Sequence, residues 1–304
     1  MTHPLSMGID LGGTKIHAVV LGPDGSTQWE KRIATPRDDY AATLGALVGL
    51  VEAGDEATGR QGMTVGLGGP GSLTPEGLLK NANSTWMNGQ AIERDLTLAL
   101  KRPVRFANDA NCLALSEATD GAGARHPVVF AVILGTGNGA GIAVNGRVLT
   151  GPNGLAGEFG HVPMPWAEAS DPQFDCYCGQ RGCNETVLSG TGIARDHEYV
   201  TGQKITTGEI AQRAATGDAA CIATLERHSV RLAKALAGVI NLLDPDVIVL
   251  GGGVSLMPHL YERVPALWSQ WVFSGGLKDT VRTKLRPSVH GDASGVRGAA
   301  WLWR

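Results

Sequence analysis

The chain has 304 residues, 43% of them hydrophobic and 18% charged, and its formal net charge is -3 at pH 7. This length predicts two domains with sizeable buried cores, and the near balance of charge, without a basic patch, argues against nucleic acid or an anionic membrane as a partner. The longest apolar runs have strand length and are too short to span a membrane, so we expect a cytoplasmic protein.

Glycine turns and helical patterns organise the first part of the chain. A strand at 7–10 meets a Gly12-Gly13 turn and returns as a second strand, whereas the spacing of Leu44, Leu47 and Val51 predicts a helix. Patterning places the elements of this part as follows: strands at 7–10, 15–21, 63–67 and 103–107, and helices at 38–59 and 110–119.

The second part of the chain repeats this layout. An apolar strand at 128–134 runs into a glycine turn carrying a threonine, and an antiparallel strand follows at 141–145. We interpret the repeat as an internal duplication of architecture. Further patterns predict helices at 184–199, 219–243 and 294–303, with a strand at 246–250.

One histidine and three cysteines form a candidate metal site. His161 is followed by Cys176, Cys178 and Cys183, which is the ligand set of a closed tetrahedral zinc site. A disulfide framework is disfavoured because the chain has only five cysteines and no apolar leader peptide. A chance cluster of small buried thiols is the remaining alternative.

Three predicted strand ends carry glycine clusters that could cradle phosphate. Backbone N–H groups can approach phosphate oxygens where side chains are absent, and threonine hydroxyls add donors. Each cluster alone fits an ordinary hairpin turn equally well, but three together favour nucleotide binding. The candidate residues are Gly12, Gly13, Thr14 and Lys15, then Gly135, Thr136, Gly137 and Gly139, then Gly251, Gly252 and Gly253.

Residues 135–140 also match the Gly-x-Gly-x-x-Ala dinucleotide fingerprint, with Glu158 near the expected place of its ribose-binding acid. That fingerprint must open a helix, whereas 140–144 alternates like a strand. A dinucleotide enzyme is therefore disfavoured, and no Gly-x-x-x-x-Gly-Lys-Ser/Thr loop indicates a P-loop kinase.

These motifs, in this order, resemble the ROK family of repressors and sugar kinases over nearly the whole chain. The matching blocks are Asp10-x-Gly-Gly-Thr-Lys, Leu134-Gly-Thr-Gly-x-Gly, Gly157-Glu-x-Gly-His and Cys176-x-Cys-Gly-x-x-Gly-Cys-x-Glu. The resemblance implies an α/β two-domain actin-like ATPase and sugar kinase (ribonuclease H-like) fold, with duplicated mixed sheets and an interdomain cleft. It predicts a small domain at 1–110 plus 292–304 and a larger domain at 111–291 that carries the zinc site.

The resemblance also implies roles for the acids. Asp109 is similar to the family's catalytic general base, although a plain helix cap is its alternative. Asp10 is expected to orient Mg²⁺, which takes few carboxylates and keeps much of its water. The implied cofactors are ATP, Mg²⁺ and a structural Zn²⁺.

Sugar contacts are implied at Asn83, Asn108, Asp109, Glu158, His161 and Glu185. His161 would use one ring nitrogen for zinc and the other for the sugar, or for a backbone carbonyl instead.

The segment 80–89 resembles bacterial fructokinases, so D-fructose, converted to fructose 6-phosphate, is the expected substrate. A mannokinase, glucokinase or N-acetylhexosamine kinase is the alternative within the family. A non-catalytic sugar sensor is disfavoured by Asp109 and the phosphate loops. Dimers are common in the family, so a homodimer is expected, and a small-molecule hexose is the expected substrate partner.

Overall fold

A computed structural model describes residues 5–60, 62–274 and 279–304. The chain separates into two compact units: unit 1 draws on 1–125, 141–156 and 289–304, and unit 2 on 126–140 and 157–288. The predicted domains divide the chain at other positions and stay a prediction. Within the described residues, no helix is both long and apolar enough to cross a membrane.

Unit 1 is built on a five-stranded mixed sheet in the order β3-β2-β1-β4-β7. Strand β1 pairs with β2 antiparallel and with β4 parallel, and β4 pairs with β7 parallel. Its elements are β1 (Ser6–Leu11), β2 (Lys15–Leu21), β3 (Thr27–Ala34), α1 (Tyr40–Thr58), β4 (Thr64–Gly69), β5 (Ser72–Leu73), β6 (Leu79–Lys80), η1 (Thr85–Met87), α2 (Ile92–Leu100), β7 (Val104–Asn108), α3 (Asp109–Asp120), β10 (Arg147–Val148), η5 (Gly291–Ala293) and α9 (Ser294–Trp301).

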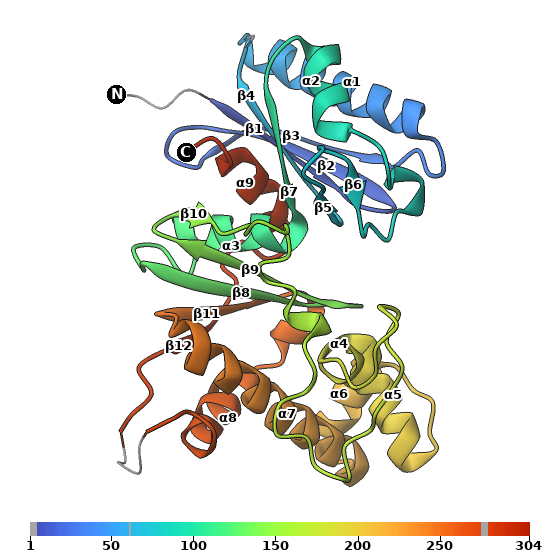
Figure 1. Cartoon of the computed structure of the whole chain (residues 1–304), viewed down its shortest axis with the longest axis vertical. Helices are drawn as coiled ribbons and strands as arrows, with labels where there is room; N and C mark the ends of the chain where they lie inside the picture. The colour runs from blue at the N-terminus through green and yellow to red at the C-terminus, as the bar shows by residue number, and fades with distance from the viewer. Residues whose placement is uncertain (1–4, 61, 275–278) are drawn as a thin grey trace. The chain divides into compact units, whose positions relative to one another are not determined.

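Helices cover both faces of this sheet. Val20 of β2 belongs to a buried cluster with Leu47 of α1, whereas the next residue, Leu21, belongs to a cluster with Trp301 of α9. Because successive side chains of a strand point to opposite faces, α1 lies on one face and α9 on the other (Figure 1). The predicted helix at 38–59 is confirmed as α1, capped by Asp39 and ended by Gly59 in the left-handed conformation.

Helix α9 packs so closely against the sheet on one side and against α3 on the other that three glycines are required. A methyl group on Gly8 of β1 would lie 2.1 Å from the carbonyl oxygen of Val296, and one on Gly66 of β4 would lie 1.8 Å from that of Ala299. On its other side, a methyl group on Gly298 would lie 1.7 Å from a carbonyl oxygen of α3. Helix α9 is therefore wedged between the sheet and α3.

The second strand repeat begins in unit 2, which also holds most of the remaining helices. The second sheet has the order β10-β9-β8-β11-β12, in which β11 pairs parallel with β8 and with β12. The further elements are β8 (Val128–Leu134), β9 (Asn138–Val144), η2 (Phe159–His161), α4 (Glu185–Leu188), α5 (Gly190–Thr201), α6 (Thr207–Ala215), α7 (Ala219–Leu243), β11 (Val247–Gly251), η3 (Gly253–Leu256), α8 (Leu260–Leu267), η4 (Trp268–Gln270) and β12 (Lys284–Pro287).

The two sheets have the same arrangement of strands in chain order, which confirms the predicted duplication. One predicted element differs: the helix expected at 184–199 is two helices, because Ser189 adopts an extended conformation and caps α5 by accepting from the N–H of Gly192. The Ser189 hydroxyl accepts a hydrogen bond from a backbone N–H that would otherwise be free in the first turn of α5. Helical periodicity alone does not reveal such a cap.

The wedge of α9 gives a stability prediction. We expect Gly66→Ala to lower the free energy of unfolding by about 1–3 kcal/mol or more, because a methyl group overlaps the Ala299 carbonyl. Gly45→Ala is the matched control: it lies in α1 with open space around its Cβ position and should raise stability by about 0.5–1 kcal/mol. Urea unfolding measures both, and equal midpoints for Gly66→Ala and the wild type would contradict the close approach.

Candidate active site

Three parallel strands of unit 1 end in register at one edge of their sheet. Asp10 of β1 pairs with Gly68 of β4, which pairs in turn with Ala107 of β7. Ligands of open α/β sheets bind outside the carboxyl ends of such strands. Asn108 and Asp109, which follow Ala107, are thereby delivered to the same edge as Asp10.

Asn108 and Asp109 both take part in starting α3. The Oδ1 atom of Asn108 accepts from the N–H of Ala110 at 2.9 Å, and its Nδ2 donates to the carbonyl of Gly71 at 3.0 Å. Oδ1 of Asp109 accepts from the same N–H at 2.8 Å. Since Asn108 already caps the helix, capping alone does not require a carboxylate at position 109.

The carboxylates of Asp10 and Asp109 interact unfavourably. Burial, together with the charge of Asp109, raises the pKa of Asp10 to about 6, while Lys15 opposes the shift. At the start of α9, a methyl group on Gly295 would lie 3.3 Å from Oδ2 of Asp10. Two neighbouring acids in a confined place favour a bound cation, so this pair fits the Mg²⁺ that the sequence predicts.

The first glycine loop is held from behind by Thr35. Its hydroxyl donates to the carbonyl of Gly12 at 2.7 Å, and its N–H donates to that of Thr14 at 3.0 Å. Thr14 and Lys15 are exposed, and Gly12 and Gly13 are partly exposed. The backbone of this loop is therefore fixed while its outer atoms remain accessible.

Asn83 is exposed in the loop between β6 and η1. Its neighbour Ala82 is held in place by Asn88, a residue that the sequence did not single out. Asn88 accepts from the N–H of Ala82 at 2.9 Å and donates to its carbonyl at 3.0 Å. The sequence offered little signal for this clamp, because Asn88-Gly89 is typical of an ordinary turn.

The second and third glycine clusters lie side by side in unit 2. A methyl group on Gly252, whose φ is 82°, would lie 2.5 Å from the carbonyl oxygen of Leu134. The loop after β8 is closed by a 2.9 Å bond from Gly135 N–H to Gly137 and by a 2.7 Å bond from the N–H of Gly190 to Gly135. Gly251 is the buried end of β11 and Gly139 lies in β9, whereas the exposed members are Thr136, Gly137, Gly252 and Gly253.

Glu185 opens α4 and reaches the second glycine loop. Its Oε2 accepts from the N–H of Asn138 at 2.6 Å, and a methyl group on Gly137 would lie 3.1 Å from its Oε1. Burial raises the pKa of Glu185, although this N–H and His161 both oppose the shift. Glu158, the other predicted acid of unit 2, is exposed immediately before η2.

The four predicted metal ligands are brought together, with all ligand atoms within 4.8 Å of one another. Nδ1 of His161 is 3.6 Å from Sγ of Cys176, and Sγ of Cys178 is 3.7 Å from that of Cys183. Zinc–sulfur bonds of about 2.3 Å in a tetrahedron place sulfurs roughly 3.8 Å apart. The donor set and its spacing therefore fit zinc.

Helix α7 anchors the segment that carries these ligands. Arg231 donates to Asp171 and Asp196 at 2.8 Å each, and Lys234 donates to Glu168 at 2.7 Å. Both cations are buried, so their partners are needed to offset the loss of water. The sequence did not predict this network, because its members are far apart along the chain.

The second ring nitrogen of His161 has an unpredicted partner. Nε2 lies 3.0 Å from the hydroxyl of Tyr177, and the rings meet edge to face with centroids 5.0 Å apart. Although the side chain as a whole is exposed, desolvation at its hydroxyl end and the charge of Glu185 raise the pKa of Tyr177 to about 12. The Tyr177 hydroxyl, and not a backbone carbonyl, is therefore the partner of Nε2 of His161 in this structure.

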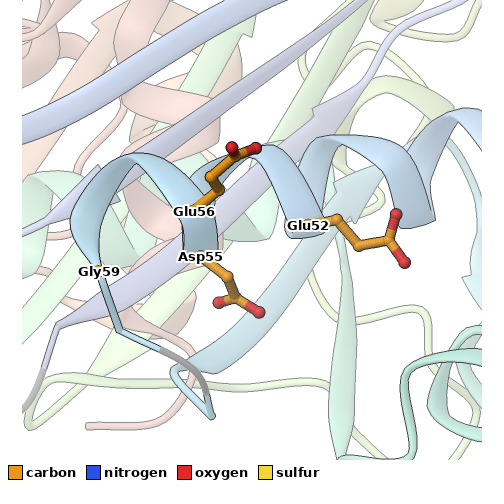
Figure 2. A pocket seen from close by; sticks show the side chains of 4 residues that line it. All are labelled: Glu52, Asp55, Glu56 and Gly59. Carbon is orange, nitrogen blue, oxygen red and sulfur yellow. The ribbon is translucent and has the colours of Figure 1, made fainter.

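A depression beside the last turns of α1 is not the active site. Figure 2 shows its lining residues, with the carboxylates pointing in different directions, and Asp55 is paired with Arg102 at 2.8 Å. No glycine cluster or predicted site residue contributes to it. It is lined by Glu52, Asp55, Glu56 and Gly59.

A sequence model of the ROK family matches residues 6–304. This chain belongs to the ROK family. The N-acetyl-D-glucosamine kinase of Pectobacterium atrosepticum is 39% identical over 302 residues, which cover 97% of each chain. The enzyme of the same name from Escherichia coli O139:H28 is 40% identical over 306 residues, which cover 97% of this chain and 98% of the relative.

Solved structures support the same family. The ROK hexokinase of Thermus thermophilus is 30% identical, with a TM-score of 0.86 over 98% of this chain and 97% of its own. A ROK glucokinase of Streptomyces griseus, in complex with glucose and AMPPNP, is 26% identical, with a TM-score of 0.77 over 98% and 99%. The predicted α/β two-domain actin-like sugar kinase fold is confirmed.

These relatives are sugar kinases by name, and the glucokinase structure was solved with glucose and AMPPNP. The predicted preference for fructose is not supported, because these relatives are N-acetyl-D-glucosamine kinases. They favour the alternative of an N-acetylhexosamine kinase. The predicted homodimer stays a prediction.

The zinc cluster can be tested by a pair of cysteine variants. Cys178 is exposed, so Cys178→Ala leaves no cavity, and we expect it to release the metal and destabilise the segment 157–185. Cys221→Ala removes a buried thiol elsewhere and should lose stability but retain zinc. Metal analysis with thermal unfolding gives both readouts, and zinc retention by Cys178→Ala would exclude this ligand.

The raised pKa of Asp10 predicts a stabilising substitution. A carboxyl group that titrates near 6 when folded and near 3.8 when unfolded destabilises the folded state above pH 6, and this cost disappears below pH 3.8. Without Mg²⁺, Asp10→Asn should raise the free energy of unfolding by about 3 kcal/mol at pH 7 and by roughly half of this at pH 5. Urea unfolding at both pH values measures the difference, and a less stable variant at pH 7 would contradict the repulsion.

Proposed function

We propose that this protein is an N-acetyl-D-glucosamine kinase, which transfers the γ-phosphoryl group of ATP to a hydroxyl group of that sugar. The observation that carries the proposal is the 39–40% identity, over nearly the full length of both chains, to kinases of that name. The position of Asp10 and Asp109 at one edge of the sheet of unit 1 supports a role in phosphoryl transfer.

Asp109 is the proposed general base. Asp109 follows the carboxyl end of β7, and Asn108 is the N-cap of α3. The carboxylate accepts the proton of the attacking sugar hydroxyl as the bond to phosphorus forms.

Phosphate groups are assigned to the glycine loops. In unit 1, Thr14 and Lys15 are exposed beside the loop that Thr35 holds. In unit 2, Thr136 and Gly137 are exposed beside the cluster at 251–253. Mg²⁺ bound through Asp10 would neutralise phosphate charge. The chain itself supplies backbone N–H groups and hydroxyls as donors.

Sugar recognition is assigned to Asn83 and Asn108 in unit 1 and to Glu158, His161 and Glu185 in unit 2. Carboxylates accept hydrogen bonds from sugar hydroxyls, and an asparagine can both donate and accept. Zinc would hold His161 through Nδ1, and so fix the backbone between Glu158 and Glu185. The metal site is thus structural, and it shapes a neighbouring polar surface.

A hexose panel tests the proposal. We expect kcat/KM, followed by ADP release, to be highest for N-acetyl-D-glucosamine among that sugar, N-acetylmannosamine, glucose, mannose and fructose. Asp109→Asn should lower kcat by roughly 10²–10⁴-fold with little change in sugar affinity, because the amide cannot accept a proton. Asp38→Asn, the same change at an exposed turn, is the matched control.

Two results would count against this assignment. Fructose exceeding N-acetyl-D-glucosamine by tenfold or more, about 1.4 kcal/mol in transition-state binding, would restore the fructokinase alternative. Near-normal turnover by a folded Asp109→Asn variant would remove Asp109 from the mechanism and reopen the sugar-sensor alternative.

A further inference from the structure

His228 is a buried histidine of α7 that takes no direct part in the proposed chemistry. Its Nε2 lies 3.1 Å from the carbonyl oxygen of Leu188, the last residue of α4. Because a carbonyl can only accept, Nε2 carries the proton and donates it to this bond. Burial lowers the pKa of His228 to about 4, so the ring is neutral at pH 7. A neutral hydrogen bond therefore joins α7 to the carboxyl end of α4.

The histidine has a cost that an apolar residue would not have. Nδ1 of the same ring is buried without a hydrogen-bond partner among the described residues. A buried polar atom that is left unpaired destabilises the folded state, whereas a methionine of similar size would avoid this penalty. The bond to Leu188 is thus the contact that accounts for a histidine at position 228.

Helix α4 is too short to hold its own position. It is a single turn, Glu185–Leu188, and no side chain caps its start. The last carbonyls of a helix have no partner within the helix, and isolated short helices are unstable. The carbonyl of Leu188 accepts from His228, and that of Glu185 accepts from the hydroxyl of Ser189 at 2.8 Å. Contacts from outside the turn therefore fix its place.

The place of this turn determines where the carboxylate of Glu185 lies. Oε2 of Glu185 accepts from the N–H of Asn138, beside the second glycine loop, at 2.6 Å. Asn184 holds the amino end of the turn through hydrogen bonds to the carbonyls of the segment 159–162, and His228 holds the carboxyl end. A turn that is held at both ends cannot rotate, so the carboxylate stays beside the loop.

We propose that His228 is a positioning residue for sugar binding, which holds α4 so that the carboxylate of Glu185 meets the sugar. This inference rests on the proposed kinase function, in which Glu185 accepts hydrogen bonds from sugar hydroxyls. His228, Arg231 and Lys234 follow one another at intervals of three residues along α7. The same helix thus holds the middle of the segment 157–185 and the turn at its end.

Two variants with unbranched side chains separate the hydrogen bond from packing. His228→Met fills the space without a donor, whereas His228→Gln places an amide nitrogen about as far from Cβ as Nε2 of histidine. We expect His228→Met to raise KM for N-acetyl-D-glucosamine roughly 5- to 20-fold with kcat within about twofold, because uniform binding is lost. In His228→Gln, KM should stay within about threefold of the wild type, because the amide can donate. Steady-state kinetics at saturating ATP measures both.

A further variant and a mutant cycle test the route through α4. His228→Asn ends near the place of Nδ1 and does not reach Leu188, so KM should rise as in His228→Met. Glu185→Gln should itself raise KM for the sugar. In that background, His228→Met should change KM by no more than about twofold, because residues that act through one contact are not additive.

His197→Met is the matched control for a general loss of packing. His197 is also buried, and its Nδ1 lies 2.9 Å from the hydroxyl of Thr224 in α7, but it belongs to α5 and not to α4. We expect this variant to unfold at a lower temperature and to keep KM for the sugar within about twofold of the wild type, since the bond to Leu188 is intact.

The outcomes distinguish this inference from the function on which it rests. A wild-type protein without turnover of N-acetyl-D-glucosamine would overturn both. Turnover of this sugar would overturn only the role of His228 if KM is unchanged in His228→Met and His228→Asn, if His197→Met shifts KM equally, or if the cycle is additive. A raised KM in His228→Met that is restored in His228→Gln and absent in the Glu185→Gln background supports the assignment.

Discussion

The close approach of α9 to β1 and β4 is the contact on which the candidate site of unit 1 depends. Gly8 and Gly66 leave room for the helix on the sheet, and Gly298 leaves room for α3 on its other side. Glu117 of α3 ties the two helices together by accepting from the hydroxyl of Ser294 at 3.0 Å. Because α3 begins with Asp109 and α9 begins beside Asp10, this wedge determines where both acids stand.

A candidate metal site and a buried ion network have the corresponding role in unit 2. The segment 157–185 contains little regular structure, so backbone hydrogen bonding alone holds it weakly. Four ligands converge at one end, and Arg231 and Lys234 of α7 hold the middle. Arg231 pairs with the largely buried Asp171 and Asp196, and removal of either partner from such a buried pair is strongly destabilising. The side chains at positions 158, 161 and 185, which we propose as sugar contacts, are therefore positioned by these interactions.

The sequence predicted the features that depend on local pattern. Glycine clusters after apolar strands located the strand ends, and the Cys-x-Cys spacing with His161 located the metal ligands. It did not predict Thr35, Asn88 or Tyr177, because each acts through a partner that only the tertiary fold brings close. The break at Ser189 was missed because one hydroxyl cap outweighs continuous helical periodicity.

The substrate prediction had a different weakness. It rested on the segment 80–89, whose conformation is held by the clamp of Asn88 on Ala82 and by burial of Ser84 and Met87. Part of this segment thus shapes the loop rather than contacts a ligand, and shape alone discriminates weakly between sugars. Resemblance in such a segment indicates a common loop conformation, which several hexoses can share.

The pair of Asp10 and Asp109 has no explanation in stability alone. Burial and mutual repulsion raise the pKa of Asp10, so the ionised pair opposes folding at neutral pH. An uncharged side chain would serve α3 equally well, because Asn108 already caps that helix. Acids kept together against their own repulsion are characteristic of sites that bind cations or move protons. In a kinase both needs arise at the same place, since phosphate requires a cation and the attacking hydroxyl requires a base.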